Sequence, residues 1–522
     1  MKPDSQKTTI PAKRIAAIDM GTNSFHGVIV DVYPDGSFTT VDKLKEMVLL
    51  AEKGFKNSLS PDAVERGLEA LRKIKTLCDH QGVVKILAYA TSAIREANNG
   101  GEFIQQVIDD LRFKPLAISG KKEAELIGKA VRYAISLDDE KSLMMDVGGG
   151  SVEFILGDYD HFYYTGSKKL GVARMTAQFV SNDPITPEEI NDLETHFRKE
   201  LAPVAEAFAR QRTNLLIGSS GTMENFAEII ANRKDVRTKV TINEFEYSAD
   251  DFMELYDEMI TLDREERSQI KGLDSKRVDI INPGLVLVKF IIEHFGIKRL
   301  KTSSEALREG MILDYITSEL DEELELLSNY PDPRERSVYE LLNKTNWHED
   351  HSRQVASLGL KLFDELQSLL GLKSDVRELF YYACLMHDIG YFISHRKHHK
   401  HALYLIRNFE LMGFSATEIE IMANVARYHR RSTPKKRHKY YRKLDDDVRQ
   451  VIKKLSGLMR IADGLDRSHY QNVLDFKVTI SDTKITLLLD TEADAELEIW
   501  GAMRKKTLFE EVTERTLEIK EI

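Results

Sequence analysis

The chain has 522 residues and a net charge of −11 at pH 7, and 42% of its residues are hydrophobic. This length predicts several globular domains, and the negative charge means that an anionic ligand has to be bound by local basic clusters. Two cysteines, Cys78 and Cys384, exclude a disulfide framework and indicate buried thiols in a reducing compartment.

No targeting or membrane-spanning segment is expected. The N-terminal residues MKPDSQKTTIPAKR contain no apolar signal core, and no uninterrupted apolar run reaches about 18 residues. We therefore expect a soluble, cytoplasmic protein with no membrane partner.

Strands alternate with helices from Arg14 to about Ile127 and again from Leu143 to about Glu319, which is typical of the α/β class. The stretch SNYPDPRERSV (Ser328–Val338) is typical of a linker. The pattern is then helical to about Arg467, and the last segment alternates like a hairpin followed by a helix. We expect two α/β domains, a helical domain and a small α/β domain, at residues 14–130, 131–320, 328–470 and 473–522.

Two similar turns, one in each α/β half, form the first candidate site. RIAAIDMGTNSFHGVIV (Arg14–Val30) and LMMDVGGGSVEFIL (Leu143–Leu156) both contain D-x-G-x-x-S between apolar strands, and their acids, Asp19 and Asp146, are 127 positions apart. The repetition predicts a duplicated fold whose glycine-rich hairpins face each other across a phosphate chain. Carboxylates and small polar residues suit a phosphate and its magnesium ion. For either turn alone, an ordinary polar turn is an equal alternative.

Three further features follow predicted strands. LLIGSSGT (Leu215–Thr222) precedes a helix whose N-terminal amides could bind an anion. Arg95, in ATSAIRE, could hold phosphate oxygens or could form a surface salt bridge. Glu123, in ISGKKEAELIGKAV, lies in the first turn of a predicted helix, where it could orient water beside a terminal phosphate. Alternatively, Glu123 and Glu125 could simply stabilise the helix dipole.

Together these motifs resemble those of one enzyme family. AAIDMGTNS, ATSAIRE, ISGKKEAELI, MMDVGGGSVEF, GSSGT and EALREG occur in the order and spacing of the exopolyphosphatase/guanosine pentaphosphate phosphatase family, over about Arg14–Tyr315. The resemblance implies a duplicated two-domain α/β fold of the actin/Hsp70/sugar-kinase type. It also implies magnesium-dependent removal of terminal phosphate from inorganic polyphosphate or guanosine pentaphosphate (pppGpp), by a homodimer.

The resemblance further implies roles for single residues. Glu123 would orient or deprotonate the attacking water, with Arg95 beside it. Asp19 and Asp146, supported by Glu153, would bind Mg²⁺. Residues of the three glycine-rich turns would hold the phosphates: Asn23, Ser24, Gly148, Gly149, Gly150, Ser151, Gly218, Gly221 and Thr222.

The helical half contains a pattern of histidines and acids. CLMHDIG sets His387 beside Asp388, and His401 and His429 follow downstream. The order resembles that of HD-domain phosphohydrolases, in which such residues bind one or two divalent metals, and imidazole and carboxylate ligands suit manganese, iron or zinc. The alternative is an HD-like helical domain that has lost this activity. The candidate ligands of a second divalent metal are His351, His387, Asp388 and Asp463.

A basic segment, RYHRRSTPKKRHKYYRK (Arg427–Lys443), contains nine Arg and Lys residues and no acid. Such a run is most often a solvated loop, and nucleic-acid binding is a general alternative that we do not expect here. Beside the phosphate motifs we favour a track that binds the remainder of a polyphosphate chain, with an affinity that falls as salt rises. The track would consist of Arg430, Arg431, Lys435, Lys436 and Arg437.

The predicted function is therefore that of an exopolyphosphatase that trims the chain terminus processively. A pppGpp 5′-phosphohydrolase on the same site is the nearest alternative, and the basic segment favours polyphosphate. A non-catalytic sensor of polyphosphate or an alarmone would not need Glu123. A sugar kinase would need a sugar pocket for which the sequence shows no residues, and fold alone does not establish function.

Overall fold

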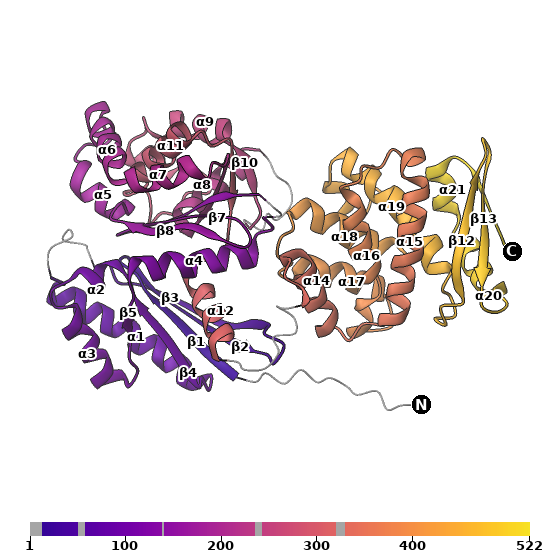
Figure 1. Cartoon of the computed structure of the whole chain (residues 1–522), viewed down its shortest axis with the longest axis horizontal. Helices are drawn as coiled ribbons and strands as arrows, with labels where there is room; N and C mark the ends of the chain where they lie inside the picture. Colours follow the sequence, from indigo (N-terminus) through magenta and orange to yellow (C-terminus); the bar gives the residue numbers. More distant parts are fainter. Residues whose placement is uncertain (1–12, 51–57, 138–139, 235–242, 320–328, 522) are drawn as a thin grey trace. The chain divides into compact units, whose positions relative to one another are not determined.

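The computed structural model of the chain describes residues 13–50, 58–137, 140–234, 243–319 and 329–521. Among these residues two compact units are distinguished, the first ending at Pro333 and the second beginning at Arg334. The first unit contains the mixed helices and strands coloured indigo to magenta in Figure 1, and the second contains the orange helices and the yellow sheet.

The first sheet of unit 1 has the strand order β3-β2-β1-β4-β5. β1, β2 and β3 are antiparallel, whereas β4 and β5 run parallel to β1. Apolar residues of β1 and β2 form one core with residues of α1 and α3. The elements are β1 (Lys13–Met20), β2 (Ser24–Val32), β3 (Phe38–Met47), α1 (Pro61–His80), β4 (Lys85–Ala90), α2 (Ser92–Glu96), α3 (Gly100–Leu111) and β5 (Leu116–Ala117).

The second sheet has the strand order β10-β11-β9-β6-β7-β8. β6 and β7 are buried along their whole length, which agrees with their continuous apolar sequence. The strands are β6 (Ser142–Val147), β7 (Val152–Gly157), β8 (Phe162–Lys168), β9 (Leu215–Ser219), β10 (Glu246–Ser248) and β11 (Arg299–Thr302). The helices are α5 (Val172–Phe179), α6 (Pro187–Glu200), α7 (Ala202–Arg210), α8 (Ser220–Arg233), α9 (Ala249–Met259), α10 (Arg264–Ser268) and α11 (Asn282–Phe295).

The two sheets repeat one arrangement. In the second sheet β8, β7, β6, β9 and β11 take the places that β3, β2, β1, β4 and β5 take in the first, and β10 is an added edge strand. Three antiparallel strands followed by two parallel strands, present twice, form the duplicated actin-like fold. The predicted α/β fold class and the duplication are confirmed.

Two helices meet between the sheets of unit 1. α4 (Gly120–Ala134) begins after β5, where the Ser119 side chain accepts a hydrogen bond from the Lys122 amide. α12 (Leu307–Glu319) packs against α4 at Gly310, where a Cβ would lie 2.1 Å from the Leu126 carbonyl oxygen. The predicted boundary between residues 130 and 131 falls within α4, which is continuous from Gly120 to Ala134.

Unit 2 is a helical domain followed by a small sheet. Its helices are α14 (Pro333–Lys344), α15 (Glu349–Leu370), α16 (Val376–Leu385), η1 (Ile389–Phe392), α17 (His398–Asn408), α18 (Ala416–Tyr428), η2 (Tyr441–Lys443), α19 (Asp446–Gly464), α20 (Glu496–Met503) and α21 (Thr507–Thr513). The sheet has the order β12-β13-β14, with β12 (Val473–Ile480), β13 (Lys484–Thr491) and β14 (Thr516–Glu521). The helical domain and the C-terminal hairpin are as the sequence indicates.

The predicted linker differs from the structure in its second half. Ser328 lies outside the described residues, but α14 begins at Pro333, so the stretch up to Val338 is helical. Proline is well tolerated at the first helical position, because its amide would have no helical partner there. Among the described residues, no helix combines the length and the apolar character needed to cross a bilayer.

Candidate active site

The two glycine-rich turns of unit 1 contact each other. The first turn joins β1 to β2 and contains Asn23, and the second joins β6 to β7 and contains Gly149. A Cβ on Gly149 would lie 2.7 Å from Asn23 Nδ2, so only glycine allows this approach. The second turn is closed by a hydrogen bond from the Gly148 amide to the Ser151 carbonyl oxygen (3.1 Å). The repeated motif therefore forms two turns that meet.

The acids of the repeat occupy matching positions in the two hairpins. Asp19 pairs with His26 across β1 and β2, and Asp146 pairs with Glu153 across β6 and β7. Asp146 Oδ2 accepts a hydrogen bond from Ser219 Oγ (2.7 Å) at the end of β9. Asp19 Oδ1 is buried and has no hydrogen-bond partner among the described residues. An unpartnered buried carboxylate oxygen is costly, which favours a cation beside it.

Glu123 lies in the first turn of α4 and is held there by Arg95, which lies in α2. Arg95 Nη1 donates to Glu123 Oε2 (2.8 Å) and to the Ile118 carbonyl oxygen (2.9 Å). Glu123 is 5% exposed, so this is a buried pair rather than a surface salt bridge. Burial raises the pKa of Glu123 to about 7, although Arg95 opposes the rise. A carboxyl group with such a pKa can take or give a proton at neutral pH.

Repulsion among the acids raises their pKa values further. Burial, and then the charge of Glu123, raise the pKa of Asp19 to about 7. Burial raises the pKa of Asp146, and burial with the charges of Glu123 and Asp146 raises that of Glu153 well above its ordinary value. These carboxyl groups thus act on one another within one small region. A divalent cation there would lower all of these pKa values by stabilising the charged forms.

Some of the candidate phosphate-binding residues already make hydrogen bonds or close contacts within the protein. Ser24 Oγ is hydrogen-bonded to His26 Nε2 (2.7 Å), and Thr222 Oγ1 donates to the Val147 carbonyl oxygen (3.1 Å). Gly218 lies against Met223, where a Cβ would approach Met223 Cε to 2.4 Å. Close packing therefore requires glycine at residue 218, and this residue stays a candidate for binding phosphate together with the turn residues of the two hairpins.

Two arginines near these acids are absent from the predicted site. Arg277 Nη1 donates to Thr222 Oγ1 (3.0 Å), and a Cβ on Gly221 would lie 2.0 Å from Arg277 Nη2. The charge of Arg308, in the first turn of α12, lowers the pKa of Asp19, against the effect of burial. Arg308 lies within the motif EALREG, so the sequence carries a signal for it, whereas Arg277 lies outside every motif.

The same arginines act on His26. Burial, followed by the charges of Arg308, Lys45 and Arg277, lowers the pKa of His26 to about 3. His26 is therefore neutral at physiological pH, and its surroundings are cationic. The site thus combines an acidic part, suited to a metal ion, with a basic part suited to phosphate oxygens.

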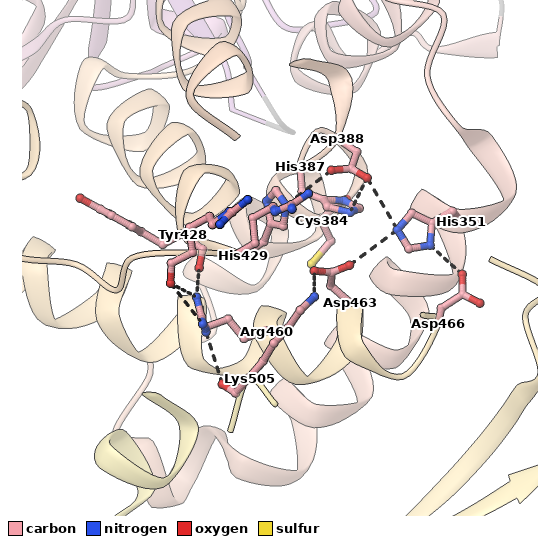
Figure 2. Close-up of polar contacts among 12 residues, drawn as sticks. His351, Cys384, His387, Asp388, Tyr428, His429, Arg460, Asp463, Asp466 and Lys505 are labelled. Atoms are coloured by element: carbon pink, nitrogen blue, oxygen red, sulfur yellow. Dashed lines mark hydrogen bonds and ion pairs between the residues drawn. The ribbon is translucent and has the colours of Figure 1, made fainter. Parts of the chain in front are cut away.

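The histidines and acids of the helical half form a separate cluster in unit 2 (Figure 2). His351 on α15 and His387 after α16 reach Asp388 Oδ2 with their Nε2 atoms, at 3.9 and 3.6 Å. Asp463 on α19 lies 3.8 Å from His351 Nε2 and forms an ion pair with Lys505. The four predicted candidates are thus brought together.

Among the downstream histidines the structure differs from the prediction. His398, not His401, reaches the cluster, and its Nε2 lies 3.2 Å from Asp388 Oδ1. Nε2 of His429 lies 3.5 Å from the same oxygen. A Cβ on Gly390 would lie 2.0 Å from the His398 carbonyl oxygen. The glycine after the His-Asp pair therefore lets the N-terminus of α17 approach Asp388, and this close approach selects His398.

The basic segment is anchored to the helical domain rather than being a free loop. Arg460 Nη1 donates to the carbonyl oxygens of Tyr428 (3.1 Å) and Arg431 (3.4 Å). His438 stacks on Tyr428 and hydrogen-bonds to its hydroxyl (2.8 Å). Within the segment, the exposed members of the predicted track are Arg431, Lys435, Lys436 and Arg437, whereas Arg430 is half-buried.

A duplicated actin-like fold with paired acids and glycine-rich turns defines a class of enzymes that act on phosphate groups, and comparison with known proteins specifies the family. The sequence profile of the Ppx/GppA phosphatase family matches residues 28–319, and that of Ppx/GppA phosphatase domain III matches residues 334–500. The chain belongs to the Ppx/GppA phosphatase family, and it is a hydrolase. The predicted family and enzyme class are confirmed.

Solved structures agree with this assignment. An exopolyphosphatase from Cytophaga hutchinsonii is 31% identical, with a TM-score of 0.55, over 58% of this chain and 98% of its own. The Ppx/GppA family member from Aquifex aeolicus is 26% identical, with a TM-score of 0.51, over 59% of this chain and 98% of its own. The similarity to each thus spans almost the whole of the solved protein.

Proposed function

We propose that this protein is an exopolyphosphatase that removes terminal phosphate from inorganic polyphosphate. The observation that carries the proposal is the buried Glu123, held by Arg95 and surrounded by Asp19, Asp146 and Glu153. The exopolyphosphatase from Cytophaga hutchinsonii supports the choice of substrate. pppGpp presents the same terminal phosphoanhydride and is the alternative substrate.

The proposed reaction uses Glu123 as the base. Its carboxylate accepts a proton from water as the water oxygen bonds to the terminal phosphorus. The bond from that phosphorus to the bridging oxygen breaks, and the electron pair stays on the shortened chain. Arg95 holds Glu123 in place and favours its ionised form, because the charge of Arg95 lowers the pKa of Glu123 against the effect of burial. Catalysis then consists of positioning and of stabilising charge on the phosphate.

The cofactor that we propose is Mg²⁺. Its ligands would be Asp19 and Asp146, with Glu153 in support, and the unpartnered Asp19 Oδ1 is an oxygen that fits a hard cation. The ion would neutralise charge on the phosphate oxygens. Phosphates would be bound by Asn23, Ser24, Gly148, Gly149, Gly150, Ser151, Gly218, Gly221 and Thr222, together with Arg277 and Arg308.

Further parts of the proposal rest on the sequence and the resemblance. We keep the division into domains at residues 14–130, 131–320, 328–470 and 473–522, a homodimer, a cytoplasmic location and the polyphosphate track. Both cysteines are free and buried, which agrees with a reducing compartment. Sedimentation of the purified protein tests the homodimer, and a monomer at micromolar concentration would contradict it.

The test is the release of orthophosphate from long-chain polyphosphate and from pppGpp, with and without Mg²⁺. We expect faster release from the polymer, and only with Mg²⁺. Glu123→Gln should lower kcat at least 10²-fold, the usual range for a general base, and should leave polyphosphate binding unchanged. Glu125→Gln, on the same helix, is the matched control. Preference for pppGpp would assign the site to that nucleotide, and no release from either would contradict the proposal.

A further inference from the structure

In each of the four histidines of the unit 2 cluster, the ring nitrogen Nδ1 points away from the cluster and lies within hydrogen-bond distance of an acceptor. Each Nδ1 faces an acceptor that cannot donate: the Asp466 carboxylate at 2.7 Å from His351, and the carbonyl oxygens of Cys384, Ala426 and His395 at 2.7, 2.7 and 3.1 Å from His387, His429 and His398. Nδ1 must therefore be the donor, so that the neutral form of each ring has its lone pair on Nε2, the form that binds a metal ion.

The four Nε2 atoms face one carboxylate. Asp388 Oδ2 lies toward His351 and His387, whereas Oδ1 lies toward His398 and His429. Nε2 of His351, Nε2 of His387 and Asp388 Oδ1 are buried and make no hydrogen bond among the described residues. Lone pairs that converge in a buried space repel one another and have lost their water, so the arrangement is costly unless a cation binds there.

Two sets of ligand atoms share Asp388. His351, His387 and Asp388 form one set, and Asp388, His398 and His429 form the other, each with ligand atoms within 4.8 Å of one another. Asp463 faces the first set through His351 (Figure 2). We propose that unit 2 binds two divalent transition-metal ions, bridged by Asp388, and that this pair of ions binds a phosphate group. Imidazole with carboxylate suits manganese, iron or zinc.

The position of Arg430 indicates that the two metal ions bind an anion. Its Nη1 lies 3.1 Å from His398 Nε2, and it forms no ion pair within the described part of the chain. Once His398 binds a metal ion, the guanidinium and that ion repel each other unless an anion lies between them. Exposed Lys435, Lys436 and Arg437 follow in the same anchored segment. A phosphate group that binds both metal ions and the guanidinium would neutralise these positive charges.

The metal content of the full-length protein tests the two-ion site. The protein is stripped with a chelator, loaded with Mn²⁺, desalted and analysed by mass spectrometry for manganese. We expect two tightly held ions per chain in the wild type and in His401→Gln, a histidine on the same helix outside the cluster. Asp388→Asn should retain none, and His398→Gln with His429→Gln should retain one. The electron paramagnetic resonance spectrum should change from a coupled pair of ions to a single ion.

Asp146→Asn separates this site from the proposed active site. It lies in unit 1 and should leave both tightly held ions in place. Thermal unfolding and circular dichroism identify any variant that fails to fold. If Asp388→Asn does not fold, the metal content of the variant with His398→Gln and His429→Gln tests the proposal in its place. Equal manganese in the wild type and in a folded Asp388→Asn, or none in the wild type, would overturn the proposal.

Binding of orthophosphate tests the ligand. The manganese-loaded protein should speed the relaxation of the phosphate ³¹P signal, and Arg430→Gln should weaken this binding at least tenfold while both ions stay bound. Arg427→Gln, one turn earlier, is the control. Competition by long-chain polyphosphate for the orthophosphate site, observed in Asp146→Asn as well, would identify the polymer as the source of the phosphate group. If the polymer does not compete, the natural ligand is a separate small phosphate ester. An unchanged affinity in Arg430→Gln would overturn the assigned ligand contact.

Discussion

Asn23 and Gly149 belong to two copies of one motif and touch each other, so that a Cβ on Gly149 would lie 2.7 Å from Asn23 Nδ2. The contact joins the turn after Asp19 to the turn after Asp146. The distance between the two acidic groups therefore depends on the lack of a side chain at residue 149.

This contact predicts the effect of Gly149→Ala. The added methyl group has to displace Asn23, which separates the two turns and misplaces the phosphate. We expect kcat/KM to fall about 10–100-fold for polyphosphate of every length, as a displacement of about 1 Å can cause. Gly101→Ala is the control, because a Cβ there has no neighbour within 4 Å and alanine favours the helix. Equal activity of the two variants would contradict the importance of this contact.

Arg95→Gln should change the pH profile of phosphate release. The charge of Arg95 lowers the pKa of Glu123, so its removal raises this pKa above about 7 and makes the base harder to ionise. The acidic limb of kcat should shift to higher pH by about one unit, and the loss of activity should be about tenfold greater at pH 6 than at pH 9. Arg72→Gln, on the exposed face of α1, should leave the profile unchanged. Parallel profiles for Arg95→Gln and the wild type would remove Glu123 as the titrating base.

Asp19→Asn should stabilise the metal-free protein at alkaline pH. The pKa of Asp19 is raised from 3.8 to about 7 in the folded state, so the folded state binds the proton more tightly than the unfolded state does. Stability from this group is present below about pH 4 and is lost as pH rises to about 7. The difference in pKa corresponds to about 4 kcal/mol as an upper limit.

The measurement is the Tm in a chelator at pH 5 and pH 8. The Tm gain of Asp19→Asn over the wild type should be several degrees at pH 8 and small at pH 5, and Mg²⁺ should raise the Tm of the wild type more than that of the variant. Asp109→Asn, on the exposed face of α3, controls for loss of a surface charge. A gain that does not grow with pH would show that Asp19 ionises freely in the metal-free state.

Neutralising the exposed part of the basic segment tests the polyphosphate track. Lys435→Gln with Lys436→Gln and Arg437→Gln should raise KM for long-chain polyphosphate at least tenfold and leave the trimer unaffected. The dependence of KM on salt should also become weaker, because fewer counterions are released. Lys373→Gln with Lys477→Gln and Lys520→Gln removes the same charge from other exposed positions of unit 2. An equal loss for trimer and polymer would contradict a track.

Local motifs determine much of the candidate site. The sequence indicates Asp19 and Asp146 because each directly precedes a glycine-rich turn between apolar strands, and such turns form from nearby residues alone. It indicates Glu123 because a strand, a loop and a helix start can be recognised in one short stretch. The pairing of Glu123 with Arg95, 28 residues away, follows from the sequence only through the resemblance to a family.

The remaining site residues are determined by contacts between segments that are far apart in the sequence, and only the tertiary structure shows these contacts. Arg277 reaches Thr222 across 55 residues, and no local pattern marks it. His398 and His401 are equivalent in sequence, since both lie in the first turn of α17. Gly390 brings the start of that helix against η1, and this packing alone places His398 at Asp388. Sequence determined the turns, the duplicated fold and the family, because these repeat in short motifs, whereas long-range packing decided which charged side chains complete each site.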